Sequence, residues 1–309
     1  MPIPASKLDR WTNYESAAIS SARDTHTNIR DQVECDNSRL NDRGEMRFDT
    51  LLQGSYANTT IVHGNGDVDI LVRMTNPYHG DTTNLNPRNE QRYENDVSYF
   101  DQNYSIKKFR TDVISELTDV YGSRAVTNRN KAVEIDSSHC SLPLDADVLP
   151  CQQYRLYTTY NGDYTDPSNY FEGVRFIASD GTEIVNYPER HIKKGTEKNE
   201  EADGNYKETI RMFKNARTRM VELGWITKDD APSYYIECLL SNVPSENFVT
   251  SNLQTRFASI VSYLQDTNMS NFSAQHGLEN LFGRSETQWR QRKARAFVDE
   301  LARLWHNGG

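Results

Sequence analysis

The hydrophobic repeat of the chain changes near Asn205. After this residue, apolar side chains recur every three or four positions, which is the spacing of one face of an α-helix. Before it, short apolar runs rich in β-branched and aromatic residues are bounded by Gly, Asn and Asp, a pattern typical of strands and turns. The 309 residues are enough for about two domains. The sequence therefore predicts an α+β fold, with a mixed sheet in an N-terminal lobe and a helical C-terminal lobe.

Local patterns predict where the elements of the N-terminal half begin and end. Apolar residues from Leu8 to Val33 keep helical spacing, so one long N-terminal helix is expected. Residues 75–97 contain two Pro and several Asn with little that is apolar, which predicts a long exposed loop. A later strand is expected to end at Pro150, and Asp180-Gly181 predicts the tight turn of a hairpin.

The charged, glycine-containing segment 190–205 predicts the boundary between the lobes. It gives a catalytic lobe of residues 1–195, which includes the N-terminal helix, and a helical lobe of residues 196–309. In the second lobe, Gly224 is expected to follow one helix and Pro232 to open the next.

Composition excludes several classes of function. The 35 Lys and Arg against 44 Asp and Glu give a net charge of −9, which disfavours a protein that grips a nucleic-acid backbone. No run approaches the roughly 20 apolar residues of a membrane span, so no membrane partner and a cytoplasmic location are expected. The four cysteines are scattered without a CxxC pair, which favours reduced thiols.

Two short motifs carry the candidate chemistry. Gly54-Ser55 ends one predicted strand, and Asp67-Val68-Asp69 opens the next after eleven intervening residues. Side chains at positions i and i+2 of a strand project from the same face, so Asp67 and Asp69 can converge on one point. Paired carboxylates suit Mg²⁺, which also binds phosphate oxygens. A glycine without Cβ and a serine hydroxyl beside them can cradle an anion.

A third carboxylate is needed if two metal ions are to share the work of activating a nucleophile and holding a leaving group. Asp147 is the candidate, because it lies in the apolar strand Leu144–Pro150, where a charged side chain is costly unless it has a ligand. Asp145 lies two positions away on the same predicted face and remains an alternative.

These residues resemble a known family. The segment GSYANTTIVHGNGDVDILV looks like the signature of the polymerase-β-type nucleotidyltransferases, and more narrowly of the cGAS/DncV-like nucleotidyltransferases. The stretch ADVLPC is similar to the strand that carries their third acid, which favours Asp147 over Asp145. The resemblance implies a polymerase-β-like lobe, a helical lobe and a long N-terminal helix bracing both. It also implies two Mg²⁺ ions, with Mn²⁺ as an alternative, bound by Asp67, Asp69 and Asp147.

Further roles follow from the same resemblance. Gly54 and Ser55 are expected to hold the triphosphate of the donor nucleotide, and Lys214, in RMFKNARTRM, falls where the family tends to carry a lysine that contacts it. Asn186 falls in the region of a base-sensing residue and resembles the members that accept a pyrimidine, so ATP and UTP are the expected substrates. The family's Gly-Thr pair is replaced here by Asn58-Thr59-Thr60.

The activity that the resemblance implies is the joining of nucleoside triphosphates into a cyclic dinucleotide or larger ring, as a bacterial signal against phage read by a downstream effector. Zinc and activation by DNA are not expected, because His139, Cys140 and Cys151 have the wrong spacing for a tetrahedral site. A ubiquitin-ligase-like partner acting on Gly309 is a further expectation, since the chain ends in Gly-Gly. Two alternatives stay open: a transferase that modifies an RNA, protein or small-molecule acceptor, and a catalytically inactive scaffold or nucleotide sensor.

Overall fold

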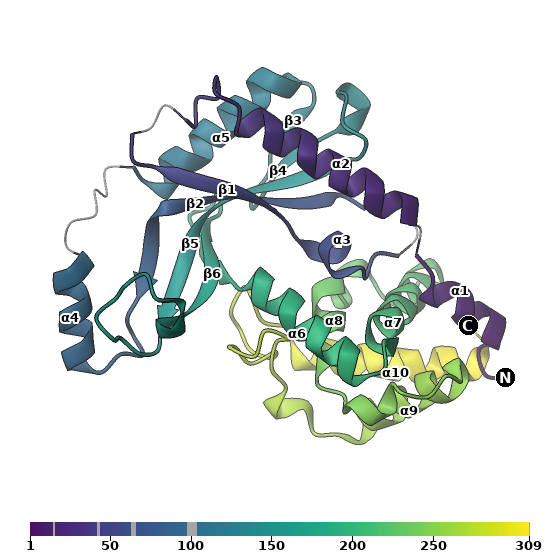
Figure 1. Ribbon diagram of the computed structural model, residues 1–309. Coiled ribbons are helices and arrows are strands. Elements are labelled where there is room, and N and C mark those ends of the chain that lie inside the picture. Colours follow the sequence, from purple (N-terminus) through teal and green to yellow (C-terminus); the bar gives the residue numbers. More distant parts are fainter. Residues whose placement is uncertain (15, 42–43, 63–65, 98–103, 309) are drawn as a thin grey trace. The chain divides into compact units, whose positions relative to one another are not determined.

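The chain divides into two compact units (Figure 1). The computed structural model describes residues 1–14, 16–41, 44–62, 66–97 and 104–308. The unit that holds the sheet, called the sheet unit below, comprises Ala17–Tyr56 and Asn65–Arg190. The helical unit comprises Met1–Ser16, Ala57–Gly64 and His191–Gly309. One boundary thus falls inside the expected segment 190–205, but the helical unit also contains the start of the chain and a short internal segment.

The sheet of the first unit is mixed, as the sequence predicts. Its strands lie in the order β1-β2-β5-β4-β3, with β6 paired to β5 and β7 paired to β6. The pairing of β2 with β5 is parallel, and the other pairings are antiparallel. The bounds of the strands are β1 Arg47–Leu52, β2 Val68–Asp81, β3 Val126–Asn128, β4 Val133–Ile135, β5 Ala146–Tyr157, β6 Tyr170–Ile177 and β7 Glu183–Asn186.

Helix α5 packs on the face of the sheet opposite to the acidic residues. Phe109 of α5 is fully buried and its ring centroid lies 6.4 Å from that of Phe48 on β1. Asp49 and Leu51 point to the opposite face, because neighbouring side chains of a strand alternate. The bounds are α2 Ser16–Val33, α3 Gly54–Asn58, α4 Pro87–Val97 and α5 Ile106–Tyr121, with short 3-10 helices at Ser137–His139 and Pro167–Asn169.

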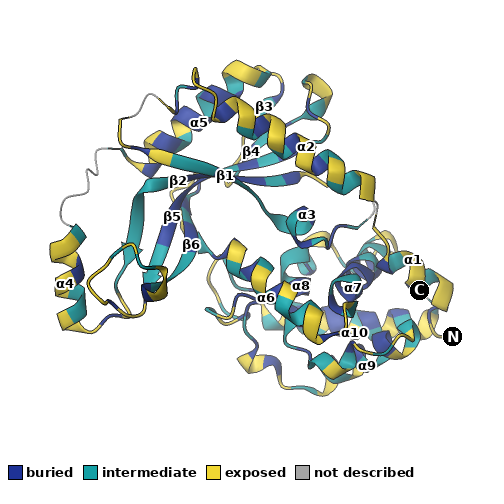
Figure 2. Ribbon diagram, in the orientation of Figure 1, coloured by how far each residue is buried: buried dark blue, intermediate teal, exposed yellow. Residues whose placement is uncertain are grey.

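The helical unit is built around one apolar core. Buried residues of its helices fill the interior, which is dark blue in Figure 2, and the rings of Phe213 and Phe257 stack at 4.9 Å. The helices are α1 Ala5–Thr12, α6 Pro188–Glu201, α7 Asn205–Glu222, α8 Ser233–Ser241, α9 Leu253–Asp266 and α10 Gln291–Asn307, with 3-10 helices at Lys228–Asp230, Ser245–Asn247 and Met269–Asn271. Gly224 and Pro232 mark helix ends as expected.

The prediction of one long N-terminal helix is wrong. The structure has α1 and α2 instead: α1 ends at Thr12, and the next residue, Asn13, has an extended backbone. Leu8 of α1 is buried in the core of the helical unit, whereas Ile29 of α2 is buried in the sheet unit. The apolar spacing runs through both helices because each must bury one face, and spacing alone does not reveal the break.

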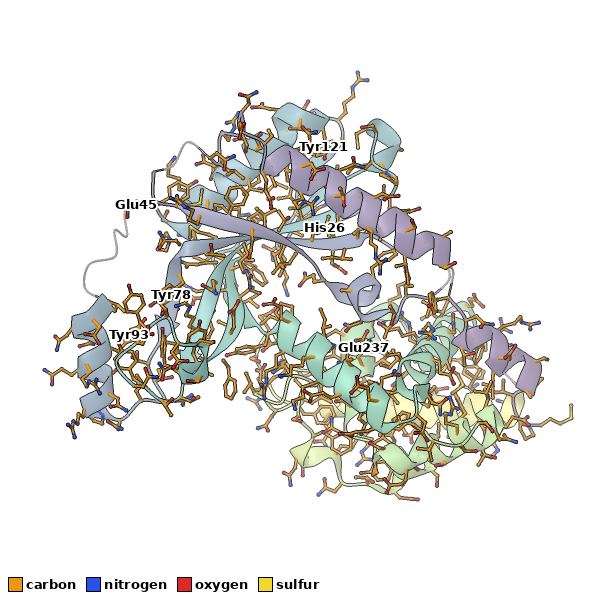
Figure 3. All side chains as sticks on the ribbon, in the orientation of Figure 1. His26, Glu45, Tyr78, Tyr93, Tyr121 and Glu237 are labelled. Atoms are coloured by element: carbon orange, nitrogen blue, oxygen red, sulfur yellow. The ribbon has the colours of Figure 1, made fainter. Side chains whose placement is uncertain are left out.

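The prediction of an exposed loop over residues 75–97 is also wrong. Strand β2 continues to Asp81, and α4 follows it. A satellite core of tyrosines supports this extension: Tyr93 of α4 packs against Tyr157 and Tyr160, with ring centroids at 4.6 and 5.6 Å. Tyr78 and Tyr93 are labelled in Figure 3. The apolar area comes from tyrosines far away in the sequence, which a local count of apolar residues does not include.

Two other boundaries differ from the predictions. Strand β5 does not end at Pro150 but continues to Tyr157, because β4 pairs with residues up to Val148 and β6 pairs from Gln152 onward. Pro150 lies between these two pairings, where its missing N–H costs no bond to either strand. The charged segment expected to mark the boundary between the lobes is largely helical, as part of α6.

The remaining local predictions are confirmed or fall outside the described residues. The hairpin of β6 and β7 turns through Gly181, whose φ is +90°. Helix α10, expected to end near Trp305, continues two residues further to Asn307 and is capped by Gly308, while Gly309 lies outside the described residues. Across the described ranges, no helix is both long enough and apolar enough to cross a membrane.

Candidate active site

Gly54 and Ser55 lie against the strand that carries the acids. Gly54 has a φ of +69°, and a Cβ built on it would lie 1.9 Å from Oδ2 of Asp69. The backbone N–H of Gln53 donates to the carbonyl oxygen of Asp69 at 2.9 Å. Only a residue without a Cβ can bring the backbone this close to the carboxylate. The glycine of the Gly54-Ser55 motif is therefore required by its contact with Asp69.

The three predicted metal ligands lie together on the sheet. Asp69 of β2 and Asp147 of β5 are paired directly across the parallel strands. Asp67 immediately precedes β2, two positions before Asp69, so alternation places it on the same face. Burial, followed by the charges of Asp67 and Glu134, raises the pKa of Asp147 above its ordinary value. The structure thus gathers negative charge at one point on this face.

The pKa of Tyr56 also responds to the negative charge of these carboxylates. Its hydroxyl donates to the carbonyl oxygen of Gly66 at 3.0 Å, just before the first acid. Burial raises the pKa of Tyr56, and the charges of Asp67 and Asp69 raise it further. The first turn of α3 is therefore held next to both carboxylates.

Asp145, the alternative third acid, has a structural role. Its Oδ1 accepts hydrogen bonds from the backbone N–H and the hydroxyl of Ser137, at 2.8 and 2.6 Å. Its carbonyl oxygen accepts from the N–H of Val68 at 2.8 Å. Because these bonds hold Asp145 in place, the geometry favours Asp147 as the third ligand.

The donor set fits Mg²⁺, although the side chains are not closed into a metal site. Within the described residues, no three His, Cys, Asp or Glu side chains form a group that could hold a metal ion as they stand. The carboxylate oxygens of Asp67, Asp69 and Asp147 are hard ligands of the kind that Mg²⁺ prefers, and their mutual repulsion favours a cation between them. Binding of the ion requires these side chains to turn toward one another.

A buried arginine organises the rest of this face. Arg73 of β2 lies four positions after Asp69 and donates to Asp49 at 2.6 and 2.9 Å, to Glu172 at 2.6 Å and to Glu189 at 3.0 Å. Burial disfavours its charged form, but Asp49, then Glu189 and Glu172, raise the pKa of Arg73 above the ordinary arginine value. One guanidinium thus joins β1, β2, β6 and the first turn of α6.

Asn186 lies on the same face as the acids. It pairs with Val174 of β6, which pairs with Gln153 of β5, and Gln153 is six positions from Asp147. Its Oδ1 accepts a hydrogen bond from the N–H of Tyr187 at 2.8 Å. With that oxygen engaged, the amide offers its two N–H donors to a ligand. Its role as a base-sensing residue stays a prediction.

Lys214 lies in the helical unit, on α7, and its side chain is only 2% exposed. Its ammonium lies 2.6 Å from Oε1 of Glu237. Gly54, Ser55, Asp67, Asp69, Asp147 and Asn186 all belong to the sheet unit, where Gly54 and the three acids lie close together and Asn186 lies on the same face, two strands away from Asp147. The predicted contact of Lys214 with a triphosphate stays a prediction.

Sequence analysis missed Arg73 and Glu237. Arg73 ends the apolar run DVDILVR, and Glu237 interrupts the apolar helix SYYIECLL. A charged residue in such a run is costly to bury unless it is paired. That signal was present at both positions, and it is the same signal that identified Asp147.

Comparisons with known proteins agree with this geometry. The family model described as the cGAS/DncV-like nucleotidyltransferase C-terminal helical domain matches residues 193–306. A cyclic UMP-AMP synthase of Rhodothermus marinus is 35% identical over 100% of both chains. The cyclic nucleotide synthase CdnE01 of Staphylococcus haemolyticus is 33% identical over 99% of both.

A solved structure is similar over the whole chain. The Rhodothermus marinus CdnE c-UMP-AMP synthase, determined with Apcpp and Upnpp, superposes with a TM-score of 0.84 and 35% identity, covering 100% of this chain and 98% of that one. The α+β fold with a helical C-terminal part is thereby confirmed. The chain belongs to the cGAS/DncV-like nucleotidyltransferases and is a nucleotidyltransferase.

Proposed function

We propose that this enzyme joins one uridine and one adenosine nucleotide, taken from UTP and ATP, into a cyclic dinucleotide. Synthesis of cyclic nucleotides is the activity named for its full-length relatives. The observation that supports uracil in particular is the geometry of Asn186, whose oxygen is engaged by Tyr187 and whose N–H donors remain. Uracil presents carbonyl acceptors, whereas cytosine presents an amino donor in place of one of them.

Different residues of the sheet unit would bind the triphosphate and the metal ions during nucleotidyl transfer. Gly54 and Ser55 would hold the triphosphate of the donor nucleotide, and Asp67, Asp69 and Asp147 would hold two Mg²⁺ ions. Bound Mg²⁺ would polarise the phosphoryl group and lower the pKa of the attacking ribose hydroxyl. Through its bond to Glu189, which lies three residues after Asn186 in the first turn of α6, Arg73 ties the strand of the acids to the segment that carries Asn186.

The predicted base preference can be tested by replacing the side-chain amide of Asn186 with a carboxylate. Asn186→Asp replaces the amide donors with acceptors at almost the same size. In competition among the four NTPs, read by mass spectrometry of the product, wild type should incorporate uracil and adenine, and the variant should shift from UTP toward CTP. Asn84→Asp, at an exposed position, is the matched control. An unchanged product from Asn186→Asp would remove the proposed role of Asn186.

The same product assay distinguishes a cyclic nucleotide synthase from a transferase that modifies a separate acceptor. A product formed from NTPs with no added acceptor supports a cyclic nucleotide synthase. If a product appears only when an RNA, protein or small-molecule acceptor is supplied, the enzyme modifies that acceptor instead. An absence of Mg²⁺-dependent NTP binding would favour the inactive scaffold.

Two cellular roles follow from the family resemblance. The cyclic product would act in the cytoplasm as a signal in anti-phage defence, read by a downstream effector. A ubiquitin-ligase-like partner would conjugate the enzyme through Gly309. Deleting Gly308 and Gly309 should leave synthesis by the purified enzyme nearly unchanged and abolish conjugation in cells that contain the partner. Loss of synthesis would show instead that the tail is structural.

A further inference from the structure

A row of acidic residues crosses three neighbouring strands of the sheet unit. Asp69 of β2 is paired with Asp147 of β5, and Asp147 is paired in turn with Glu134 of β4. Residues that lie directly opposite one another on neighbouring strands project from the same face of a sheet. Because neighbouring strands lie about 4.8 Å apart, the row places Glu134 about 10 Å from Asp69. Glu134 therefore extends the row of candidate metal ligands by one strand.

A cation accompanies Glu134 in this row. Two carboxylates directly opposite one another repel, so the pairing of Glu134 with Asp147 is unfavourable by itself. Arg129, in the turn between β3 and β4, supplies a positive charge, since its Nε donates to Oε2 of Glu134 at 2.5 Å. Burial and the charges of Asp67 and Glu134 raise the pKa of Asp147, and the charge of Arg129 opposes them. Arg129 is thus close enough to Asp147 to affect it.

The turn that contains Arg129 is fixed by hydrogen bonds to its backbone. Arg110 of α5 donates to the carbonyl oxygens of Arg129 and Lys131, at 2.9 and 2.7 Å. The hydroxyl of Ser179, in the turn between β6 and β7, donates to the carbonyl oxygen of Arg129 at 3.1 Å. The N–H of Ser179 donates to the carbonyl oxygen of Asn130 at 2.8 Å. The side chain of Arg129 therefore begins from a fixed backbone position.

The guanidinium of Arg129 has donors that no residue uses. Its side chain is 63% exposed, and neither Nη1 nor Nη2 donates a hydrogen bond to any residue that the structure describes. A guanidinium has five N–H donors, and Glu134 engages the one on Nε. The other four form the planar fork that can bind two oxygens of one phosphate group. Glu134 thus orients Arg129 and leaves its phosphate-binding atoms free.

The order of residues along the row indicates which nucleotide lies next to Arg129. Gly54 lies at the opposite end, because a Cβ built on it would lie 1.9 Å from Oδ2 of Asp69. Gly54 and Ser55 are the proposed binding site for the triphosphate of the donor nucleotide, so the leaving pyrophosphate belongs at that end. In phosphoryl transfer the attacking and leaving oxygens lie roughly in line. The attacking ribose therefore approaches from the end of the row that holds Arg129.

We propose that Arg129 binds a 5′-phosphate group of the acceptor nucleotide, the nucleotide whose ribose hydroxyl attacks, and that Glu134 positions Arg129 for this contact. The phosphates of the acceptor are repelled by the carboxylates of the row, and a guanidinium at this place offsets that repulsion. The inference rests on the proposed synthesis of a cyclic dinucleotide and on the proposed role of Gly54 and Ser55.

The contact can be tested by removing the guanidinium and the phosphate separately and together. The donor is a 2′,3′-dideoxy NTP labelled on its α-phosphate, which has no hydroxyl to attack with. The acceptor is either an NTP or the matching nucleoside, which has the same base and ribose but no phosphate. Measuring ddATP with UTP or uridine, and ddUTP with ATP or adenosine, covers both orders of the two bases.

Arg129→Met should raise the KM of the NTP acceptor by about tenfold or more, because a charge-assisted hydrogen bond to phosphate is lost. The KM of the donor should stay as in wild type. With the nucleoside as acceptor, wild type and Arg129→Met should be equally active, since the phosphate that Arg129 contacts is absent. In the ordinary reaction of ATP with UTP, the variant should show a raised KM for one of the two nucleotides only.

Arg175→Met is the matched control. Arg175 of β6 also pairs with a glutamate on the neighbouring strand, Glu183 of β7, at 2.6 Å. It follows Val174, which is paired with Asn186, so alternation places Arg175 on the face opposite to the acids. This variant should keep the KM values of wild type. Melting curves check that both variants are folded.

Two outcomes would overturn the proposal. One is an equal loss in Arg129→Met with the NTP and with the nucleoside acceptor, because the lost contact would then not involve phosphate. The other is a wild-type KM for both ATP and UTP in the ordinary reaction, which needs no dideoxy donor. If wild type itself formed no product from NTPs alone, the proposed function would fail instead, so the two failures are distinguishable.

Discussion

Replacement of Gly54 by alanine tests the contact between the turn and the acid strand. The added Cβ would lie 1.9 Å from Oδ2 of Asp69, whereas ordinary contacts begin near 3.4 Å, so the carboxylate must move by 3.4 − 1.9 = 1.5 Å. A displacement of about 1 Å at a reacting centre can cost on the order of 100-fold in rate. We therefore expect Gly54→Ala to lower the rate by at least about 100-fold.

The backbone cost of the same substitution can be separated with a matched control. Alanine at a φ of +69° costs about 1–2 kcal/mol, which lowers Tm by a few degrees. Gly224 has a φ of +70°, and a Cβ added there would meet nothing within 4 Å, so Gly224→Ala should lose a similar Tm and keep its activity. Initial rates of pyrophosphate release and melting curves measure both effects. Equal activity of the two variants would refute the reasoning.

Three further predictions concern single side chains. Asp147→Asn should abolish product while Asp145→Asn, which loses only structural hydrogen bonds, keeps measurable activity; a reversed result would exchange their roles. In urea denaturation, Arg73→Met should lower the free energy of unfolding by about 3–5 kcal/mol, because it leaves carboxylates unpaired. Glu189→Gln, at a side chain that is 52% exposed, should lower it by less than about 1 kcal/mol. Equal losses in the two variants would contradict this account. The lowered pKa of Glu237 stabilises the fold above the ordinary glutamate value of 4.5, so stability should fall as the pH drops below it, and less steeply in Glu237→Gln.

The candidate metal ligands and the Gly-Ser turn could be predicted from the sequence because they lie in short local motifs. Gly54-Ser55 and Asp67-Val68-Asp69 are short motifs at strand ends, and strand alternation alone places both acids on one face. Asp147 was recognised as a charge in an apolar strand. The family resemblance of ADVLPC favours Asp147 over Asp145, and the structure adds a physical reason, since the hydrogen bonds from Ser137 engage the carboxylate of Asp145.

The features that the sequence did not reveal depend on residues far apart. The extension of β2 and the position of α4 rest on contacts of Tyr93 with Tyr157 and Tyr160, more than sixty residues later. The bonds of Thr60 to Lys214 and Glu237 join segments separated by 154 and 177 residues. No local pattern predicts such pairings, because the sequence of a polar turn is the same whether its side chains are solvated or bound to a buried charge.

The way the units alternate along the chain limits how this protein can be cut or recombined. Residues Ala57–Gly64 lie in the middle of the catalytic motif but belong with the helices, so a chain ending after Arg190 would carry this segment away from Glu237 and Lys214. A helical part beginning at His191 would in turn retain a buried ion pair without Thr60. Exchange of the helical unit between relatives would therefore need to carry three separate stretches of sequence, one of which, Ala57–Gly64, lies between the two stretches of the sheet unit. Each unit is compact by itself, yet neither can be exchanged as one continuous segment of the gene.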